Sequence, residues 1–350
     1  MEGEKTVLGY ILVFLAALAL GLILIALLRS LALKANFVSP QGITRLGGLG
    51  MWLAFSIVCI LGGSIYGVLS KTGWGIILGS GLLVAFGIID DYKKELSVPI
   101  KFLVQIIATI LLIFSGIKTQ IIYIGPYLNL LVTFLWVLGI TNAFNHLDIM
   151  DGLAGGIAAI SSATFFFIAL FNANLSIAVA SLALTAVTLS FLRYNLSSIK
   201  VYMGNSGSHF LGFALSAIAI AISYAPLERK IALVCPILVL GLPVYDTLFV
   251  MFMRARKGRS IFKKSDDHFA LRLKALGYSQ KKALAFMCLF GLFFSLSALI
   301  ISRVSNQIGT IILFVVILVC LVLGKKVSQR SNEMSKEKNN KECSSKGLSL

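Results

Sequence analysis

Charge is scarce in this chain. Only 13% of its 350 residues are charged, while 58% are hydrophobic, and a soluble domain typically carries about twice that share of charge. This shortage excludes a soluble globular enzyme, a disordered protein and a collagenous one. The composition therefore predicts an all-α, polytopic integral membrane protein.

The sequence has no closely spaced cysteine pair, and we expect no cleavable leader. The five cysteines include no CxxC pair, so neither a zinc site nor a disulfide framework is indicated. The first five residues contain two acids, which is too acidic for the start of a signal peptide. The apolar run that follows is too long for a leader, and we expect it to be a retained first helix.

Long apolar runs dominate the chain instead. A helix that crosses a bilayer needs roughly 20 apolar residues. The sequence predicts a single transmembrane catalytic domain over 1–324 and a disordered, basic cytoplasmic tail over 325–350. About eleven transmembrane helices are predicted, over 7–28, 47–69, 73–89, 99–117, 127–144, 153–171, 174–192, 207–224, 231–252, 283–301 and 307–324.

The cations are distributed unequally between the two sets of alternating loops. One set, with the tail, holds 25 of the 31 lysines and arginines, and the other holds six. Without the tail the difference is still 18 against six. The positive-inside rule therefore predicts an external N-terminus and a cytoplasmic C-terminus.

The aspartates and histidines are restricted to one predicted face. All seven aspartates and all three histidines lie at or near the cytoplasmic ends of spans. Ionisable groups at membrane depth are costly and indicate function. A transporter would place some of them at the bilayer midplane, where this chain has none. The ten residues are Asp90, Asp91, Asp148, Asp151, Asp246, Asp266, Asp267, His146, His209 and His268.

Two acidic motifs end apolar spans. Asp90 and Asp91 are adjacent, so their repulsion favours a cation or metal between them, although acids at a helix end in water are also ordinary. In the second motif, Asn142, Asn145, Asp148 and Asp151 recur every three residues. This spacing places them on nearly one helical face. No lysine or arginine lies within 142–152, which favours a metal or cationic partner.

Two further segments suit phosphate. Residues 202–212 are rich in glycine and serine and precede a span, so their backbone amides and the helix start favour an anion. The loop 253–282 carries ten lysines and arginines with Asp266, Asp267 and His268. Such a cluster fits a phosphorylated substrate, but topogenic charge and anionic headgroups explain many of the cations equally well. Lys101 either neutralises a phosphate or extends to the membrane surface.

Together these motifs resemble the polyprenyl-phosphate N-acetylhexosamine-1-phosphate transferase superfamily (glycosyltransferase family 4). Within it, the chain is most similar to the bacterial UDP-GlcNAc:undecaprenyl-phosphate GlcNAc-1-phosphate transferase branch. The resemblance covers about residues 39–280, in the family's order. It rests on Ser39-Pro40, Arg45–Gly48, Asp90-Asp91 with Lys101 and Gln105, NxxNxxDxxDGL at 142–153, MGNSGSxFLG at 203–212, PxxD at 243–246 and Asp267–Leu273.

The resemblance implies a reaction at the cytoplasmic face of a bacterial inner membrane. Undecaprenyl phosphate attacks the β-phosphate of a UDP-N-acetylhexosamine, UMP leaves, and a cell-envelope polysaccharide is started. Mg²⁺ is the implied cofactor, with Mn²⁺ as an alternative, and a homodimer is a further expectation. No nucleic acid is implied. The sugar is expected to be GlcNAc.

The resemblance also implies roles for individual residues. The catalytic set is Asp90, Asp91 and Asp151, and the metal ligands are Asp90, Asp91, Asp151 and Asn205. The substrate-binding residues are Lys101, Asn142, Asn145, Asp148, His268 and Arg272.

Two positions depart from the family pattern. The family usually has a metal-ligating Asp where this chain has Asn205, and a neutral amide is a weaker ligand for a hard cation. The family's HxH or HHH segment is reduced here to His268 alone, which argues against the MurNAc-pentapeptide branch. Three alternatives stay open: a weakened or inactive homologue, motivated by Asn205, a membrane lipid transporter, and a prenyltransferase that uses aspartate-rich motifs.

Overall fold

The computed structural model describes most of the chain. The described residues are 2–38, 42–65, 70–93, 96–222, 224, 229–258, 260 and 267–347. Ser39, Pro40 and Asp266, which belong to the motifs above, lie outside them.

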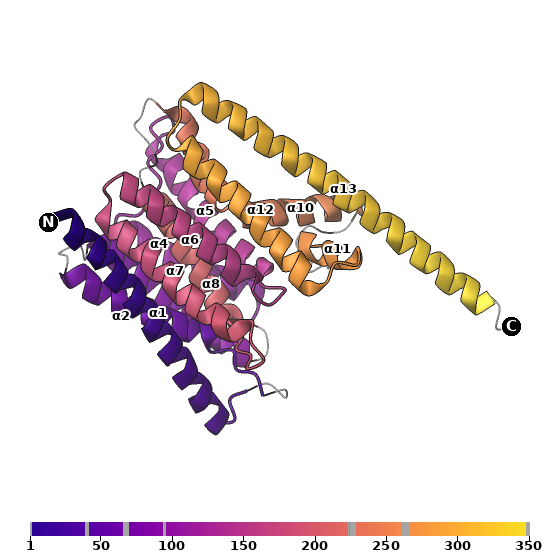
Figure 1. Ribbon diagram of the computed structural model, residues 1–350, viewed down its shortest axis with the longest axis horizontal. Coiled ribbons are helices and arrows are strands. Elements are labelled where there is room, and N and C mark those ends of the chain that lie inside the picture. Colours follow the sequence, from indigo (N-terminus) through magenta and orange to yellow (C-terminus); the bar gives the residue numbers. More distant parts are fainter. Residues whose placement is uncertain are drawn as a thin grey trace.

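The described residues form an all-helical bundle, as predicted, and the only β-contact among them is an isolated bridge between Thr44 and Val201. Figure 1 shows α1–α8 in one bundle, with α10–α13 along one side. The long helices of the first half are α1 (Glu2–Lys34), α2 (Gly47–Ile65), α3 (Lys71–Tyr92), α4 (Val98–Phe114), α5 (Pro126–Leu147), α6 (Leu153–Phe171) and α7 (Leu175–Asn195). They are followed by α8 (Gly204–Ala221), η1 (Lys230–Val234), α9 (Cys235–Val239), α10 (Gly241–Arg256), α11 (Phe269–Ala275), α12 (Gln280–Ile301) and α13 (Asn306–Gly347).

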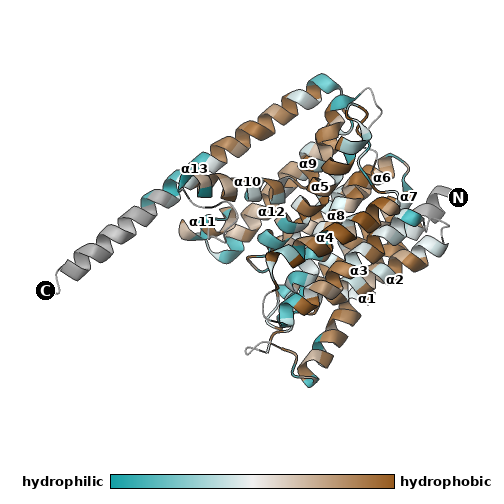
Figure 2. Ribbon diagram, turned by 180° about the vertical axis from the view of Figure 1, so that it is seen from behind, coloured by the Kyte–Doolittle hydropathy of each residue, from teal (hydrophilic) through white to brown (hydrophobic). Residues whose placement is uncertain are grey.

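Helices occur at each of the eleven predicted ranges. Eight of those described are long and apolar enough to cross a membrane, and a ninth span would be the bent pair of 230–239 and 241–256. The helix α4 is apolar but too short to be counted among these spans. The helix α8 is long enough, with 18 residues, but less apolar. The ribbons of the bundle helices are mostly brown in Figure 2, which marks hydrophobic residues. A multi-pass membrane protein follows, while the count of eleven and the orientation stay predictions.

The predicted single span over 231–252 is broken. Its two halves meet at an angle of 76° around Leu240. Pro243 has no N–H to donate to the carbonyl of Val239, so a continuous helix would lose that hydrogen bond there. The break changes the direction of the chain at α10 and places Asp246 next to His268 and Phe269.

The last helix also differs from expectation. The helix α13 continues from the apolar span to Gly347 and thus runs into 325–350, where the sequence predicts a disordered tail. It contacts α11, α12 and η1. The division into a catalytic domain and a tail stays a prediction.

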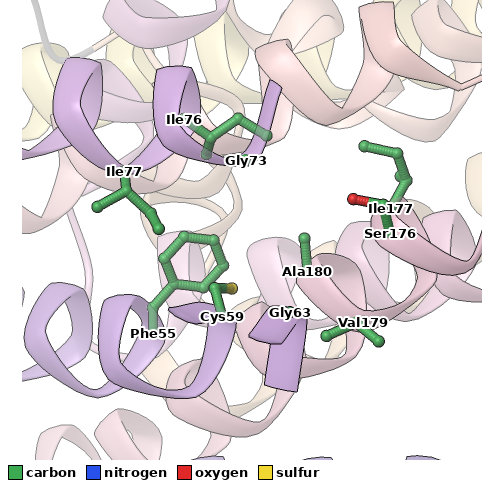
Figure 3. A pocket seen from close by; sticks show the side chains of 10 residues that line it. All are labelled: Phe55, Cys59, Gly63, Gly73, Ile76, Ile77, Ser176, Ile177, Val179 and Ala180. Carbon is green, nitrogen blue, oxygen red and sulfur yellow. The ribbon is translucent and has the colours of Figure 1, made fainter. Parts of the chain in front are cut away.

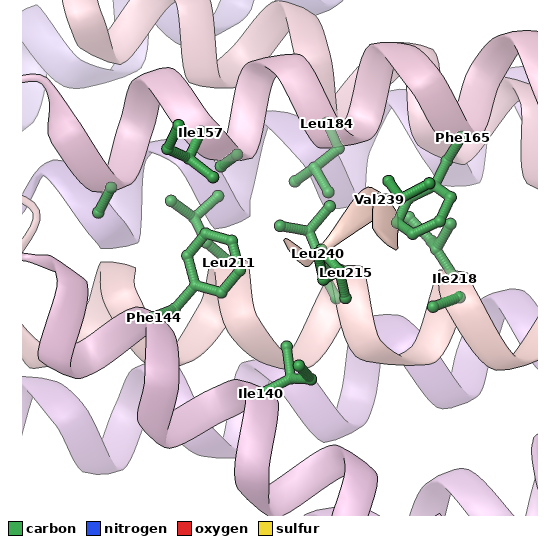
Figure 4. Packing of buried hydrophobic residues seen from close by; sticks show 14 of the residues in the cluster. Ile140, Phe144, Ile157, Phe165, Leu184, Leu211, Leu215, Ile218, Val239 and Leu240 are labelled. Carbon is green, nitrogen blue, oxygen red and sulfur yellow. The ribbon is translucent and has the colours of Figure 1, made fainter. Parts of the chain in front are cut away.

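The helix α8 is the centre of the bundle. All of its residues from Ser206 to Ala219 are buried, and it packs against α2, α3, α5, α6 and α7. A Cβ atom on Gly87 of α3 would lie 2.4 Å from the Cα atom of Ser206, so glycine is what allows the two backbones to approach closely. Figure 4 shows the surrounding apolar side chains, among them Phe144, Ile157, Phe165, Leu184, Leu211, Leu215 and Ile218.

A small apolar gap separates α2, α3 and α7. Figure 3 shows Phe55, Cys59, Ile76 and Val179 along its wall. Among the residues that the structure describes, those that line this gap are all uncharged. The polar residues singled out by the sequence lie elsewhere.

Candidate active site

The first aspartate pair meets the start of α8. The Asp91 carboxylate accepts hydrogen bonds from the backbone N–H groups of Asn205 (2.9 Å) and Ser206 (3.4 Å). These N–H groups have no partner within their own helix, so Asp91 caps α8. Gly204 begins the helix at φ +67°, and a Cβ atom there would lie 2.2 Å from Asp91 Oδ2. Glycine at this position therefore provides both the backbone conformation and the space for the carboxylate.

Asp90 lies buried between three donors. Its Oδ2 atom lies 2.6 Å from Lys101 Nζ and accepts a hydrogen bond of 2.8 Å from Asn205 Nδ2. Its Oδ1 atom accepts a hydrogen bond of 2.9 Å from the Leu96 backbone N–H. A buried carboxylate requires this kind of compensation, and it fixes Lys101 of α4 against the end of α3.

Asn205 connects Asp90 with α5. Its Oδ1 atom accepts a hydrogen bond of 2.9 Å from Asn145 Nδ2, which also donates to Ser208 Oγ at 3.0 Å. One turn earlier on α5, Asn142 Nδ2 donates to Gln105 Oε1 of α4 at 2.8 Å. The amides predicted to bind substrate therefore join α4, α5 and α8 into one network.

The two later aspartates of the period-three motif lie beyond α5. Asp148 follows the last residue of the helix and is exposed, and Asp151 lies in the turn before Gly152. The surrounding protein removes water from the carboxyl group of Asp148, and this desolvation is the largest cause that raises its pKa to about 7. Repulsion from Asp91 and Asp151 raises the pKa further. Its exposure and this electrostatic environment together mark Asp148 as an acid that a ligand can reach.

The cation that neutralises Asp151 comes from another segment. Lys200 Nζ lies 2.6 Å from Asp151 Oδ2, and the hydrogen bond and charge of Asp151 raise the pKa of Lys200. The turn itself is held by Asn195, whose Oδ1 atom accepts a hydrogen bond of 2.6 Å from the Gly152 backbone N–H. The absence of cations within 142–152 therefore does not leave Asp151 without a cationic partner.

His268 is held by a buried acid. Its Nδ1 atom lies 2.7 Å from Asp246 Oδ2, and Asp246 Oδ1 accepts a hydrogen bond of 2.8 Å from the Phe269 backbone N–H. The ring centres of His146 and His268 are 6.4 Å apart, which places this pair beside the end of α5. The loop 253–282 and the period-three motif thus lie next to each other.

Arg272 belongs to a buried ionic cluster. Arg272 Nη2 donates to Asp267 Oδ1 at 2.6 Å, and Lys257 Nζ lies 2.5 Å from the same oxygen. Burial alone would raise the pKa of Asp267, but these two cations lower it below its ordinary value. Arg272 also donates to Ser331 Oγ of α13 at 2.9 Å. Arg272 therefore connects Asp267 of this loop with the last helix, α13.

The carboxylate and amide oxygens at this end of the bundle are of the kind that binds Mg²⁺. Their positions fit such a site only in part. Carboxylate oxygens are the preferred ligands of Mg²⁺, and a cation would relieve the repulsion among Asp91, Asp148 and Asp151. However, Asp90 and Asn205 point at each other through a hydrogen bond. No three acid, histidine or cysteine side chains converge on one point among the residues that the structure describes. The four predicted metal ligands stay a prediction.

The structure brings most of the predicted residues together. Asp90, Asp91, Lys101, Asn145 and Asn205 form one connected group, and Asn142, Asp148, Asp151 and His268 lie around it. Arg272 is occupied by Asp267 and Ser331. Sequence reasoning missed Lys200, for which there was no signal, and did not select Asp246, although PxxD marked its position.

Fold and site together define a helical membrane protein that gathers acids, amides and cations at one end of its bundle. Comparison with known proteins adds a likeness to one family. The glycosyl transferase family 4 model matches residues 73–223, a range that contains Asp90, Lys101, Asp151 and Asn205. The matches therefore bear out the predicted resemblance to the superfamily of polyprenyl-phosphate N-acetylhexosamine-1-phosphate transferases and to its bacterial branch.

Individual relatives agree with this assignment. A probable undecaprenyl-phosphate N-acetylglucosaminyl 1-phosphate transferase of Bacillus subtilis is 29% identical over 92% of this chain and 93% of its own length. A decaprenyl-phosphate N-acetylglucosaminephosphotransferase of Mycolicibacterium smegmatis is 29% identical over 72% of this chain and 70% of its own. An undecaprenyl-phosphate α-N-acetylglucosaminyl 1-phosphate transferase of Escherichia coli K12 is 27% identical over 60% of each.

Proposed function

We propose that this protein transfers N-acetylglucosamine 1-phosphate from UDP-N-acetylglucosamine to a polyprenyl phosphate, with release of UMP. An oxygen of the lipid phosphate attacks the β-phosphorus of the sugar nucleotide, and the bond from that phosphorus to the bridging oxygen of UMP breaks. The names of the relatives support the acceptor lipid and the sugar. The product would be the first lipid-linked unit of a cell-envelope polysaccharide, made at the cytoplasmic face of a bacterial inner membrane.

The observation that carries this proposal is the network around Asp90. A reaction between two phosphate groups requires positive charge and fixed hydrogen-bond donors where negative charge accumulates. Lys101, held 2.6 Å from Asp90, lies beside the amides of Asn145 and Asn205. His268, fixed by Asp246, lies across the end of α5. Cations, amides and an imidazole therefore surround one position at the end of the bundle.

The residues have distinct proposed roles. Lys101 steadies a phosphate oxygen, and Asp90 keeps the ammonium group in place. Asn142 and Asn145 hydrogen-bond the nucleotide, while His268 donates to the diphosphate or the sugar. Asp91, whose oxygens already accept two backbone hydrogen bonds, holds the start of α8 against this position.

Mg²⁺, or Mn²⁺ in its place, is part of the proposal. The predicted ligands Asp90, Asp91, Asp151 and Asn205 would hold the ion through carboxylate and amide oxygens. Its charge would also relieve the repulsion among Asp91, Asp148 and Asp151. When bound, it would neutralise the diphosphate and the developing charge on the leaving group. Asn205 would contribute its amide oxygen only after its hydrogen bond to Asn145 is given up.

The direct test is transfer of label into lipid. Purified protein is incubated with Mg²⁺, radiolabelled UDP-N-acetylglucosamine and undecaprenyl phosphate, and radioactivity in the organic phase is counted. Asp90→Asn and Lys101→Gln should each reduce transfer by about 10²-fold or more, because each removes preorganised charge. Arg303→Gln, at the opposite end of the bundle, is the matched control and should leave transfer unchanged. Wild-type protein that transfers sugar 1-phosphate from none of the UDP-N-acetylhexosamines would instead identify an inactive homologue.

A further inference from the structure

A large cavity lies at the end of the bundle opposite the aspartates. Its volume is about 630 Å³, and its wall includes Thr72 of α3, Trp136 of α5 and Ile222 beside α8. Each of these helices carries residues of the candidate active site at its other end. Because a helix rises 1.5 Å per residue, the 19 steps from Thr72 to Asp91 correspond to roughly 30 Å. The cavity is therefore separate from the proposed active site.

Three cations line this cavity. They are Lys118, Arg229 and Lys230, half of the six cations that the sequence assigns to the external side. Arg229 Nη1 donates to the Ser302 carbonyl at 2.8 Å, and Lys230 Nζ lies 5.5 Å from the centre of the Tyr123 ring. No aspartate or glutamate is among its lining residues in the part of the chain that the structure describes. The described lining of the cavity thus carries three cations, and it suits an anion.

The remaining wall is apolar and aromatic. Leu233 and Ile237 line the cavity and are about half exposed, so the wall continues onto the surface that faces lipid. Trp136 and Tyr224 also line it, with their polar atoms hydrogen-bonded to the carbonyls of Ser216 and Ala219. Tyr224 follows the end of α8, where aromatic side chains at the membrane–water interface are typical, while Trp136 lies halfway along α5. A ligand that fills the cavity should therefore combine an anionic head with apolar chains.

We propose that this cavity binds an anionic phospholipid, with the phosphate near Lys118 and Lys230 and the acyl chains along Leu233 and Ile237. A soluble phosphate would use the cations but would leave the apolar wall without a partner. A zwitterionic phospholipid would use the apolar wall but gain less from the cations. The site is independent of the transfer reaction, since no residue of the candidate active site lines it.

Trp136 provides a reporter inside the cavity. The chain has three tryptophans, so Trp52→Phe/Trp74→Phe leaves Trp136 as its only tryptophan, which is excited selectively at the red edge of tryptophan absorption. Quenching is measured with brominated phosphatidylglycerol and brominated phosphatidylcholine in detergent. Phosphatidylglycerol should quench at much lower concentration. Lys118→Gln/Lys230→Gln should raise its half-quenching concentration by about fivefold per lysine, because each cation near an anionic headgroup contributes attraction of that order.

The controls separate the cavity from general surface charge. Lys71→Gln/Arg303→Gln removes two cations of the same predicted face that do not line the cavity, and it should leave quenching unchanged. Inorganic phosphate at millimolar concentration should not displace phosphatidylglycerol. As a second measurement, the lipid retained by protein with all three tryptophans is quantified by native mass spectrometry. Equal quenching by both lipids, displacement by inorganic phosphate, or an equal effect of the control variant would each overturn the proposal.

Discussion

Asp246 forms a hydrogen bond with one ring nitrogen of His268, with 2.7 Å between Asp246 Oδ2 and His268 Nδ1. The same carboxylate accepts the Phe269 backbone N–H through its other oxygen. A carboxylate on one ring nitrogen fixes the orientation of an imidazole and leaves the other nitrogen for a ligand. Asp246 is therefore a positioning residue, and it exists in this place because the chain bends by 76° before α10.

Asp246→Asn should reduce transfer activity by about 10- to 100-fold, which is typical when the partner of a functional histidine is lost. Label transfer measures the effect. If Asp246 acts through His268, the double variant Asp246→Asn/His268→Gln should be no worse than His268→Gln alone. Additive losses would contradict this role. Tyr245→Phe, which removes the neighbouring hydroxyl bonded to the Cys320 carbonyl, is the control for local packing.

Asn205→Asp should make the protein depend more strongly on a divalent cation. Asn205 Nδ2 now donates to Asp90 Oδ2 at 2.8 Å, whereas a carboxylate would place two like charges together. Without Mg²⁺ the variant should lose about 1–3 kcal/mol of stability, the usual cost of a lost buried partner. With Mg²⁺ it should recover and keep or exceed wild-type transfer. Thermal unfolding and Mn²⁺ binding by electron paramagnetic resonance test both parts.

The swapped pair is the control for this prediction. Asp90→Asn/Asn205→Asp restores one amide and one carboxylate, so its stability should not require Mg²⁺. A variant Asn205→Asp that loses transfer at every Mg²⁺ concentration would show that the amide itself is needed.

Lys200→Gln should lower the Mg²⁺ concentration required for half-maximal transfer. Lys200 Nζ lies 2.6 Å from Asp151 Oδ2 and is 40% exposed, so it competes with any cation for that carboxylate. An exposed pair of this kind contributes at most about 1 kcal/mol, which limits the change to roughly fivefold and leaves the melting temperature nearly unchanged. Asp151→Asn should move the Mg²⁺ requirement in the opposite direction. An identical Mg²⁺ profile for wild type and Lys200→Gln would contradict the role of Asp151.

Local patterns predicted the helices and selected most of the residues that the structure brings together in the candidate site. Apolar runs of membrane length located every long helix, and period three at 142–151 correctly put two asparagines on one face of α5. The pattern could not show that α5 ends at Leu147, which leaves Asp148 as its cap and Asp151 in a turn. Helix ends depend on capping contacts that span the chain, such as Asn195 with Gly152.

Contacts between distant segments were beyond sequence reasoning. Lys200 is 49 residues from Asp151, and no periodicity connects the two. The break before Asp246 had a visible signal in Pro243, but a long apolar run outweighed it. Asn205 was recognised as unusual, yet its hydrogen bonds to Asp90 and Asn145 follow only from how α3, α5 and α8 pack.

The pKa of about 7 at Asp148 predicts opposite pH dependences for stability and activity. An aspartate in an unfolded chain has its ordinary pKa of about 3.8. Between about pH 4 and pH 7 the folded protein therefore binds more protons at this residue than the unfolded chain. Stability should fall as the pH rises through this window. Transfer that uses the ionised carboxylate should rise over the same range, by about tenfold per pH unit below the pKa.

Asp148→Asn removes the titrating carboxyl group of Asp148 and so distinguishes its pH effect from that of the other ionisable groups. The variant should melt with a smaller decrease in melting temperature between pH 4 and pH 7 than the wild type, and its residual transfer should lose the rise that ends near pH 7. Added Mg²⁺ should shift the wild-type rise to lower pH, because a bound cation favours the ionised carboxylate. Asp267→Asn is the matched control, since Lys257 and Arg272 keep the pKa of Asp267 low and this acid stays ionised across the window. A wild-type activity profile that does not change between pH 5 and pH 8 would exclude Asp148 from the reaction.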